Sequence, residues 1–410
     1  MLIIFIFVLL LFILAYRFYF CYPLDFYYFI CFGVAYYIIS PYIVYLSGGL
    51  LNYPGISSWR DYLYYFSEAY EYLCIIFFAF TVPIFICNKF FLRIKTPNIK
   101  MSEISSLSLV ISFFSIMILC FYLWYSAYDA NLLFSGYTSE YSTRIMGNMA
   151  TTNLLLNFLA IYSNLICKKK IKKIYIALII INSLFLLSMG GRMYVVTIII
   201  PWLMIYGDNV KTLKDFIRKF KISLILVSLI ILFCAIGIFR LGITDFSFMI
   251  YIFFAEPIFT SYSSVTYLLY NSNIPLLNNG MLFISSFLGI IPSFIMENKY
   301  SLYLLPEHMG FYYESPFGAT SIIVYLFTSF GVFGAFIFMC FLAFFYSIMS
   351  KIAKTCVFFK TFYLCALSII PFIFFRESFY ISTRIIVFPI FILPMCVFIF
   401  DRCLHILSRK

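Results

Sequence analysis

Long apolar runs separated by short polar segments dominate the chain from its first residue. A helix that crosses the hydrocarbon core of a bilayer needs about 20 mostly apolar residues. The pattern therefore predicts an all-α, polytopic membrane bundle of about eleven transmembrane helices, with residues 1–410 forming one integral membrane domain. We expect these helices near residues 1–16, 26–46, 71–87, 106–124, 151–167, 174–189, 193–207, 222–239, 320–349, 361–375 and 385–400.

The stretch 174–207 is predicted to be a helical hairpin rather than one helix. A single helix would be about 50 Å long, and it would place the lysine-rich segment 168–173 and the basic segment 211–221 on opposite sides of the membrane. A turn at Gly190-Gly191-Arg192 removes both difficulties. Each arm then has about 16 residues, or about 24 Å, so we expect the turn and Arg192 to lie recessed within the membrane.

Basic residues collect in alternate connecting loops. One set of loops holds 21 of the 28 lysines and arginines and five acidic residues, a net charge of +16, whereas the opposite set holds seven basic and eleven acidic residues, a net charge of −4. The two sum to the overall +12. Because basic loops stay in the cytoplasm, the amino terminus is predicted to lie outside and the carboxyl terminus inside.

Composition excludes several classes of protein. Hydrophobic residues make up 64% of the chain and charged residues 11%, with a mean hydropathy of +1.03, whereas a soluble globule has about 25% charged residues. The basic residues form short clusters between apolar runs, which does not indicate nucleic-acid binding. No CxxC occurs, and the twelve cysteines fall within the apolar runs or beside their basic ends, so neither a disulfide framework nor a zinc site is predicted.

A segment of about 80 residues, 240–319, separates two of the predicted spans and is expected to form a large extracytoplasmic loop. Its two apolar stretches, 246–260 and 281–295, are interrupted by Pro257 and Pro292. We expect them to form short helices that lie in the membrane interface or re-enter the bundle. A long loop with structure of its own is usually functional.

The basic residues of the acidic side are almost all arginines. Of seven, six are arginine, whereas 16 of the 21 on the basic side are lysine. The rigid arginine fork binds phosphate through two hydrogen bonds and keeps its charge when partly desolvated. A functional role is favoured for Arg192 and Arg240. For Arg384, a functional role and a purely structural role are favoured equally.

A structural role is favoured for Arg60, Arg144 and Arg376. These side chains extend to lipid headgroups or pair with acidic residues such as Glu256 and Glu377.

Candidate proton acceptors lie in the same large loop. His308 is its single histidine, within Pro306-Glu307-His308-Met309-Gly310, and a group that titrates near neutrality suits removal of a proton from a sugar hydroxyl. Glu256, Glu307 and Glu314 are rival bases. The chain has no DxD, HExxH, P-loop or GxSxG motif, so metal, nucleotide and serine-hydrolase chemistries lack support.

Three segments together resemble the O-antigen polymerases, the Wzy-type oligosaccharide repeat-unit polymerases of bacterial envelopes. The first is Ser188-Met189-Gly190-Gly191-Arg192, and the second is Phe239-Arg240-Leu241-Gly242. The third is Phe317-Gly318-Ala319-Thr320-Ser321, followed by Tyr325, Phe330-Gly331 and Gly334. The motifs cover residues 190–340, and the pattern of spans extends the likeness to the whole chain.

The resemblance implies a glycosyltransferase of the bacterial inner membrane that builds the O-antigen of lipopolysaccharide or another surface polysaccharide. It would move a growing glycan from undecaprenyl pyrophosphate to the terminal sugar of a second lipid-linked repeat unit, without a metal or other cofactor. Arg192, Arg240 and Arg384 would bind the pyrophosphate, and His308, Glu256 or Glu314 would deprotonate the acceptor hydroxyl. The implied partners are undecaprenyl-pyrophosphate-linked oligosaccharides and membrane lipids. Binding of a chain-length regulator protein is left open by the resemblance.

Two other functions remain at this point. An O-antigen ligase, or another lipid-dependent glycosyltransferase, would share the donor and differ in its acceptor. A flippase or transporter for lipid-linked sugars would be expected to have two similar halves and charged residues within its spans. The nearly charge-free spans and the single long loop favour a transferase.

Overall fold

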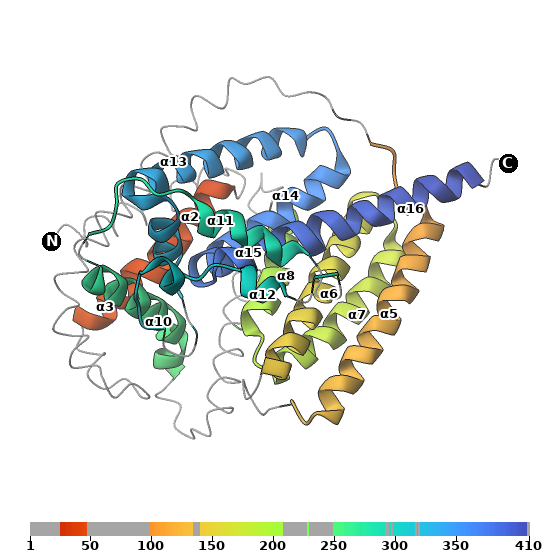
Figure 1. The fold of residues 1–410 in the computed structure, drawn as a ribbon. Coiled ribbons are helices and arrows are strands. Elements are labelled where there is room, and N and C mark those ends of the chain that lie inside the picture. The colour runs from red at the N-terminus through yellow and green to blue at the C-terminus, as the bar shows by residue number, and fades with distance from the viewer. Residues whose placement is uncertain are drawn as a thin grey trace, which may run out of the picture. The chain divides into compact units, whose positions relative to one another are not determined.

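The computed structural model describes residues 25–46, 99, 101–133, 140–207, 228, 249–271, 273–291, 295–296, 298–315, 318 and 320–407. Every regular element within these ranges is a helix, which confirms the predicted all-α class for this part of the chain (Figure 1). Contacts between Cα atoms divide the protein into two compact units. Each unit is described by itself.

Unit 1 comprises residues 1–94, 207–347 and 370–383. Its described elements are α2 (Phe26–Val34), the π-helix η1 (Ala35–Ile39), α3 (Ser40–Leu46), α10 (Met249–Tyr270), α11 (Met281–Ser286), η4 (Phe287–Ile290), α12 (Lys299–Leu302), η5 (Pro306–Met309), most of α13 (Ile322–Ile352), η7 (Ile370–Phe374) and the start of α15 (Phe379–Val387).

Unit 2 comprises residues 95–206, 348–369 and 384–410. Its described elements are α5 (Ser106–Asp129), α6 (Glu140–Leu165), α7 (Lys169–Ser188), α8 (Arg192–Gly207), the end of α13, α14 (Val357–Ile369), the end of α15, the π-helix η8 (Phe388–Ile392) and α16 (Leu393–Leu407).

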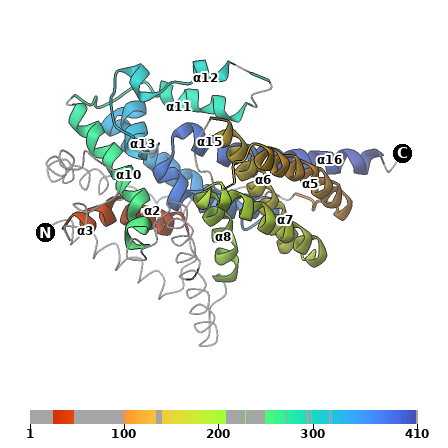
Figure 2. The same ribbon diagram turned by 90° about the horizontal axis from the view of Figure 1, so that it is seen from below.

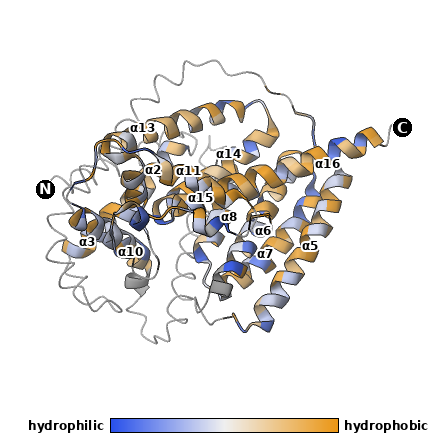
Figure 3. Ribbon diagram, viewed as in Figure 1, coloured by the Kyte–Doolittle hydropathy of each residue, from blue (hydrophilic) through white to orange (hydrophobic). Residues whose placement is uncertain are grey.

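Six helices within the described residues are long and apolar enough to cross a membrane, so the chain is a membrane protein. They are Phe26–Leu46, Ser106–Asp129, Lys169–Ser188, Ile322–Ile352, Val357–Phe374 and Phe379–Leu407. Figure 3 shows the apolar character of α5, α13 and α16 along much of their length. Each of the six overlaps a predicted span, and α6 and α8 cover the spans predicted at 151–167 and 193–207. The predicted spans at 1–16, 71–87 and 222–239 lie outside the described residues, so the number eleven stays a prediction.

The centre of unit 1 is built from aromatic rings packed against a glycine. Gly33 of α2 has no side chain, and the ring of Phe375 occupies the space that a Cβ there would need. The same ring stacks on Tyr37, with centroids 5.9 Å apart and planes 3° apart. At the start of α2, Phe26 stacks on Tyr346 of α13, with ring centroids 4.6 Å apart. These contacts fix α2 and η1 against α13 and the helix that ends at Arg376.

Helix α13 breaks at Gly331, which has φ 72° and ψ −179°. The break leaves backbone groups without partners in the helix, and the extended segment 275–280 provides partners for them. The amides of Val332 and Phe333 donate to the carbonyls of Pro275 and Leu276 at 3.1 and 2.9 Å. In return, segment 275–280 donates to the carbonyls of residues 329 and 330. Irregular backbone inside a membrane protein is tolerated where the protein itself satisfies it.

The environment of α13 changes at this break. Residues 322–327 are all buried, whereas large apolar side chains after the break are exposed: Val332, Phe333, Phe336, Ile337 and Phe341. Gly331 lies 20 residues before Lys351, and a helix of that length spans about 30 Å, the thickness of the hydrocarbon core. The part of α13 after Gly331 is therefore the part whose length and exposure fit a membrane crossing.

The described part of the predicted loop 240–319 contains five helical elements: α10, α11, η4, α12 and η5. Helix α10 runs for 22 residues straight through Pro257, so the expected interruption there was wrong. It packs beside η1 and α3, and the hydroxyl of Tyr36 donates to the carbonyl of Phe253 at 2.7 Å. The second apolar stretch forms α11 and η4, which together end at Ile290. Pro292 lies outside the described residues.

In unit 2, the long helices α5, α6 and α7 lie side by side (Figures 1 and 2). Helix α6 is buried along most of its length and carries the polar groups that join its neighbours. Asn153 Nδ2 donates to Ser183 Oγ at 2.9 Å, and Asn157 Nδ2 donates to the carbonyl of Ile198 at 3.2 Å. Hydrogen bonds of this kind hold helices together where lipid leaves no hydrophobic drive between them. They also make α6 less apolar than the six candidate spans.

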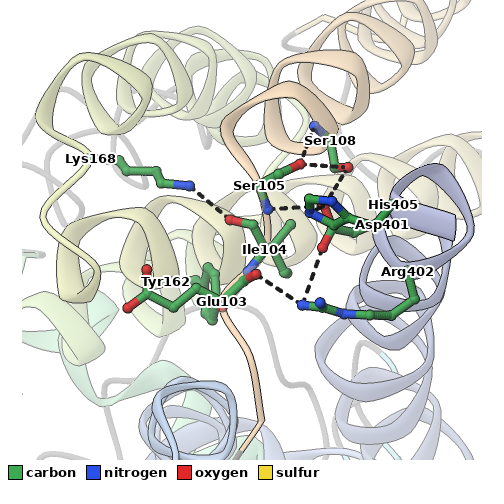
Figure 4. A network of polar contacts seen from close by, with 9 residues as sticks. All are labelled: Glu103, Ile104, Ser105, Ser108, Tyr162, Lys168, Asp401, Arg402 and His405. Carbon is green, nitrogen blue, oxygen red and sulfur yellow. Dashed lines mark hydrogen bonds and ion pairs between the residues drawn. The ribbon is translucent and has the colours of Figure 1, made fainter. Parts of the chain in front are cut away.

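A second polar network fixes the start of α5 (Figure 4). Ser105 is the N-cap of this helix, and its amide donates to Asp401 Oδ1 of α16 at 3.0 Å. Ser108 Oγ donates to the same oxygen at 2.8 Å, while Arg402 Nη2 lies 3.3 Å from the other. Lys168 Nζ donates to the carbonyl of Ile104 at 2.8 Å. A fully buried carboxylate thus joins α16 to the N-terminus of α5, where negative charge is favoured.

Candidate functional site

An arginine held between two glutamates forms a charged cluster among the described residues of unit 1. Arg376 Nε donates to Glu256 Oε2, and Arg376 Nη1 donates to Glu377 Oε1. The side chains are 17%, 24% and 13% exposed, respectively. The pairing that the sequence suggested as the alternative for Arg376 is therefore present in the structure. We call Glu256, Arg376 and Glu377 the Arg376 cluster.

Three separate parts of the chain bring the Arg376 cluster together. Glu256 lies in α10, one residue before Pro257, while Arg376 and Glu377 follow η7, just before α15. Thr320 Oγ1 donates to the carbonyl of Arg376 at 3.0 Å and so fixes the backbone that carries the guanidinium. Thr320 belongs to the third segment of the resemblance, and the next residue, Ser321, accepts the amide of Ile323 at 3.3 Å at the start of α13.

The Arg376 cluster carries one more negative than positive charge when all three groups are ionised. Burial raises the pKa of the Glu377 carboxyl; Arg376 opposes this shift and the charge of Glu256 adds to it. Removing a carboxylate from water favours its neutral form, whereas a neighbouring guanidinium favours the charged form. The direction of the shift shows that desolvation outweighs the single arginine shared by two acids.

Tyr37 lies beside this cluster. Its side chain is 1% exposed, and its hydroxyl has no hydrogen-bond partner among the described residues. The phenol also interacts electrostatically with all three members of the cluster. A buried hydroxyl without a partner is uncommon in native proteins, so the described side chains leave this corner of the cluster with unused hydrogen-bonding capacity.

Glu314 is held by a different set of side chains, from one face of α10. Tyr262 donates its hydroxyl to Oε2 and Tyr270 donates its hydroxyl to Oε1, each at 2.6 Å. The Glu314 amide donates to Thr266 Oγ1 at 3.0 Å. Residues 262, 266 and 270 follow one another at intervals of four and therefore share a helix face. Both carboxylate oxygens of Glu314 already accept a hydrogen bond from a phenol.

His308 lies on the short helix η5 and is exposed. Its Nδ1 accepts the amide of Leu305 at 3.2 Å, so the ring caps its own turn. In the neutral imidazole a nitrogen that accepts a hydrogen bond carries no proton, which places the proton on Nε2. As arranged, His308 presents a donor rather than an acceptor to any group beyond this turn.

Comparison of the three expected bases favours Glu256 on geometry. One of its oxygens is held by Arg376, and its other oxygen, Oε1, has no hydrogen-bond partner within the described part of the chain. Each oxygen of Glu314 already accepts one hydrogen bond from a phenol, and the Nδ1 of His308 accepts the amide of Leu305. A general base needs an acceptor atom within hydrogen-bonding reach of the proton it removes.

Arg192 lies in unit 2, where it begins α8 immediately after the predicted turn. Helix α7 ends at Ser188, and the amide of Gly191 returns to the carbonyl of Leu186 at 2.7 Å. Gly190 has φ 95°, a conformation that glycine adopts readily and that commonly ends a helix. The predicted break is therefore confirmed, with two helices joined at a glycine turn, whereas their return past each other as a hairpin stays a prediction. Its depth in a membrane stays a prediction.

The other expected arginines are distributed as follows. Arg384 lies in unit 2, where its Nη2 is 3.4 Å from Asn148 Oδ1 of α6. Arg144 is exposed on α6. Arg240 and Arg60 lie outside the described residues. The structure thus places Glu256, Glu314 and His308 in unit 1 and Arg192 and Arg384 in unit 2.

No family model matches the chain, and no characterised protein or solved structure shows a significant match to it.

Sequence reasoning did not select two members of this site. Glu377 was named only as a partner for arginine, and Tyr37 was read as part of an apolar span. The available signal was indirect: Glu377 follows Arg376 directly, and it is separated from the run of η7 by two residues. Nothing local marks Tyr37 among 36 tyrosines, because only the packing of η1 against Phe375 gives it a charged neighbourhood.

Proposed function

We propose that this protein is a polymerase of O-antigen or another bacterial surface polysaccharide, embedded in the inner membrane with its amino terminus outside and its carboxyl terminus in the cytoplasm. It transfers a growing glycan from undecaprenyl pyrophosphate to the terminal sugar of a second lipid-linked repeat unit. The observation that carries the proposal is the fixed carboxylate of Glu256, held by Arg376 near one end of an apolar helix.

Helix lengths support placing this cluster at the outer end of the membrane. Arg376 lies 19 residues after Val357, and a helix of that length rises about 28 Å. Lys354, just before that helix, and Lys360, in its first turn, belong to the basic segments that we assign to the cytoplasm. The cluster then lies close to the outer interface, where a lipid-linked substrate exposes its pyrophosphate and first sugars.

The proposed reaction needs a base and a stabilised leaving group. The acceptor hydroxyl oxygen attacks the anomeric carbon of the donor glycan and forms the new glycosidic bond. The bond from that carbon to the pyrophosphate oxygen breaks, and its electron pair leaves with undecaprenyl pyrophosphate. The hydroxyl proton passes to Oε1 of Glu256. Preorganised arginines stabilise the charge that develops on the pyrophosphate, so no metal is needed.

The roles of the remaining residues follow from their contacts. Arg376 orients Glu256 by donating a hydrogen bond to its Oε2. Arg192, Arg240 and Arg384 stay the proposed pyrophosphate ligands. Glu314 and His308 are less suited to act as base than Glu256, because each Glu314 oxygen and the Nδ1 of His308 already accept one hydrogen bond, whereas Oε1 of Glu256 accepts none within the described residues.

The test uses a deletion strain complemented with variants, and its readout is the ladder of surface polysaccharide on a gel. Glu256→Gln keeps the shape and can still accept from Arg376, but it cannot take up a proton. We expect long chains to disappear and single capped repeat units to remain, with normal amounts of protein in the membrane. Arg192→Ala and Arg240→Ala should give the same result. Normal chain length in Glu256→Gln would remove Glu256 as the base.

A ligase gives a different pattern in the same experiment. Loss of a ligase leaves long polymer on undecaprenyl pyrophosphate and none on lipid A core, whereas loss of a polymerase leaves single units on lipid A core. Arg144→Ala is a matched control, because Arg144 is an exposed arginine to which we assign no substrate role. We expect this variant to make a normal ladder.

A further inference from the structure

The surface around Glu314 combines a fixed carboxylate with exposed aromatic rings. Tyr270 is 55% exposed and Tyr312 is 61% exposed. Tyr270 ends α10 and contacts the carboxylate directly, while Tyr312 is two residues before it in the chain. We call Tyr270, Tyr312 and Glu314 the tyrosine–carboxylate surface.

The backbone beneath this surface is held rigidly. Asn271 Nδ2 donates to the carbonyl of Tyr312 at 2.8 Å, and Asn271 Oδ1 accepts the amide of Tyr312 at 3.2 Å. One amide side chain therefore binds both polar groups of residue 312. The ring of Phe311 stacks on the buried Tyr267 of α10, with ring centroids 5.9 Å apart. Segment 311–314 is therefore fixed to α10 and to Asn271 at residues 311, 312 and 314.

The chemistry of this surface selects a class of ligand. A carboxylate has about four acceptor positions, and the two phenols occupy one on each oxygen. Within the described residues no cationic side chain pairs with Glu314, so the remaining positions are available to hydroxyl donors. Exposed ring faces beside a hydrogen-bond acceptor suit a ligand that has apolar C–H faces and hydroxyl edges. Sugars have both.

We infer that the tyrosine–carboxylate surface is a binding subsite for the oligosaccharide part of the substrate, with Glu314 accepting sugar hydroxyls and Tyr270 and Tyr312 contacting ring faces. This inference rests on the proposed function for the identity of the glycan, but binding can be measured without turnover. It assigns Glu314 to holding the glycan, and it leaves proton transfer to Glu256.

The probe is the lipid-free oligosaccharide released by mild acid from the surface polysaccharide of the strain that carries the protein. Binding to the full-length protein in detergent is followed by saturation-transfer NMR and by titration. Tyr270→Ala removes a ring and one hydrogen bond to Glu314, so we expect affinity to fall by about tenfold or more. Tyr270→Phe keeps the ring face and should lose less.

Two further variants separate a binding role from a structural one. Tyr312→Ala keeps the backbone bonds to Asn271 and removes only an exposed ring, so it tests the subsite even if Tyr270→Ala is poorly folded. Tyr128→Ala is the control, since Tyr128 is a 70% exposed tyrosine at the end of α5. We expect weaker binding for Tyr312→Ala and wild-type binding for Tyr128→Ala.

The outcomes distinguish this inference from the proposed function. Wild-type affinity in Tyr312→Ala and Tyr270→Ala, or no binding to the wild-type protein, overturns the subsite and leaves the test on Glu256 unaffected. Weaker binding in both variants, together with a normal polysaccharide ladder in the deletion strain, supports the subsite and overturns the polymerase. Preference for a quaternary ammonium probe over the oligosaccharide also overturns the inference, because a carboxylate among aromatic rings can bind such cations.

Discussion

The carbonyl oxygen of Pro275 occupies the space that a Cβ on Gly331 would need. The same oxygen accepts the amide of Val332 at 3.1 Å, so the close approach and the hydrogen bond are one feature. Gly331 also has φ 72°, a conformation that L side chains rarely adopt. The break in α13 therefore depends on glycine twice, for its backbone conformation and for the missing side chain.

Gly331→Ala is expected to lower the free energy of unfolding by about 2–4 kcal/mol, because the methyl group would displace segment 275–280 and the backbone would be strained. Chemical unfolding in detergent micelles measures the difference. Gly147→Ala is the matched control: nothing lies within 4 Å of a Cβ placed there, and residue 147 is inside α6. That change should be neutral or stabilise the protein by up to about 1 kcal/mol. Equal effects at the two positions would contradict the packing described for Gly331.

Arg376→Ala leaves two partly buried carboxylates without a counter-charge. We expect the free energy of unfolding to fall by about 1–3 kcal/mol, less than for a fully buried pair because these side chains keep some exposure. Adding Glu256→Gln to Arg376→Ala should restore part of the loss, since the double variant has one unpaired charge fewer. A double-mutant cycle in detergent measures this coupling. Strictly additive losses would show that the two side chains do not interact.

Glu377→Gln should change the dependence of stability on pH. The pKa of Glu377 is raised from its ordinary value of 4.5, chiefly by burial, so the folded protein favours the protonated form. Its contribution to stability is therefore fully present below the ordinary pKa and is lost as the pH rises through the raised value. Because glutamine does not ionise, Glu377→Gln loses no stability in this way and should be at least as stable as wild type at neutral pH. Thermal unfolding at pH 4.5 and pH 8 tests the sign, and a wild type that gains stability relative to the variant on going to pH 8 would contradict it.

Asp401→Ala is expected to destabilise unit 2 by about 2–3 kcal/mol, because the amide of Ser105 and the hydroxyl of Ser108 lose a buried acceptor. Asp129→Ala, at the opposite end of α5, is the comparison. Asp129 is exposed and lies at the helix C-terminus, where negative charge is unfavourable, so its removal should be neutral or slightly stabilising. Unfolding midpoints for the two variants decide the matter, and similar values would contradict the role given to Asp401.

Cys167 allows a direct test of orientation. It is exposed and directly precedes the lysine-rich segment that begins at Lys168. In a variant that keeps only this cysteine, a membrane-impermeant maleimide should label inside-out vesicles and leave intact spheroplasts unlabelled. Replacing Cys167 with Ser in the same background is the control for non-specific labelling. Labelling from the outside of intact cells would reverse the proposed topology and with it the location of the Arg376 cluster.

The helices were predictable because their signal is local. Runs of apolar residues near 26–46, 106–124 and 361–375 need no knowledge of neighbours, since a bilayer requires the same length from each. The turn at Gly190 and Gly191 was predictable for a related reason: two adjacent glycines and the positions of flanking charges restrict the options within a few residues. Helix α10 was not, because Pro257 is a local signal for interruption that tertiary packing against η1 overrides.

For the functional groups, too, some features could be predicted from the sequence and others only from the tertiary structure. Sequence alone identified Glu256, Glu314 and His308 as candidate bases, and it favoured a structural role for Arg376. It offered Glu256 and Glu377 as partners of Arg376 but could not decide that this pairing forms, 120 residues apart in the chain for Glu256, or that each oxygen of Glu314 accepts a phenol hydrogen bond. Hydrophobic length is a property of a segment, so the sequence by itself determined a bundle of membrane helices. The state of each carboxylate depends on partners brought together from distant segments, and only the tertiary structure decided it.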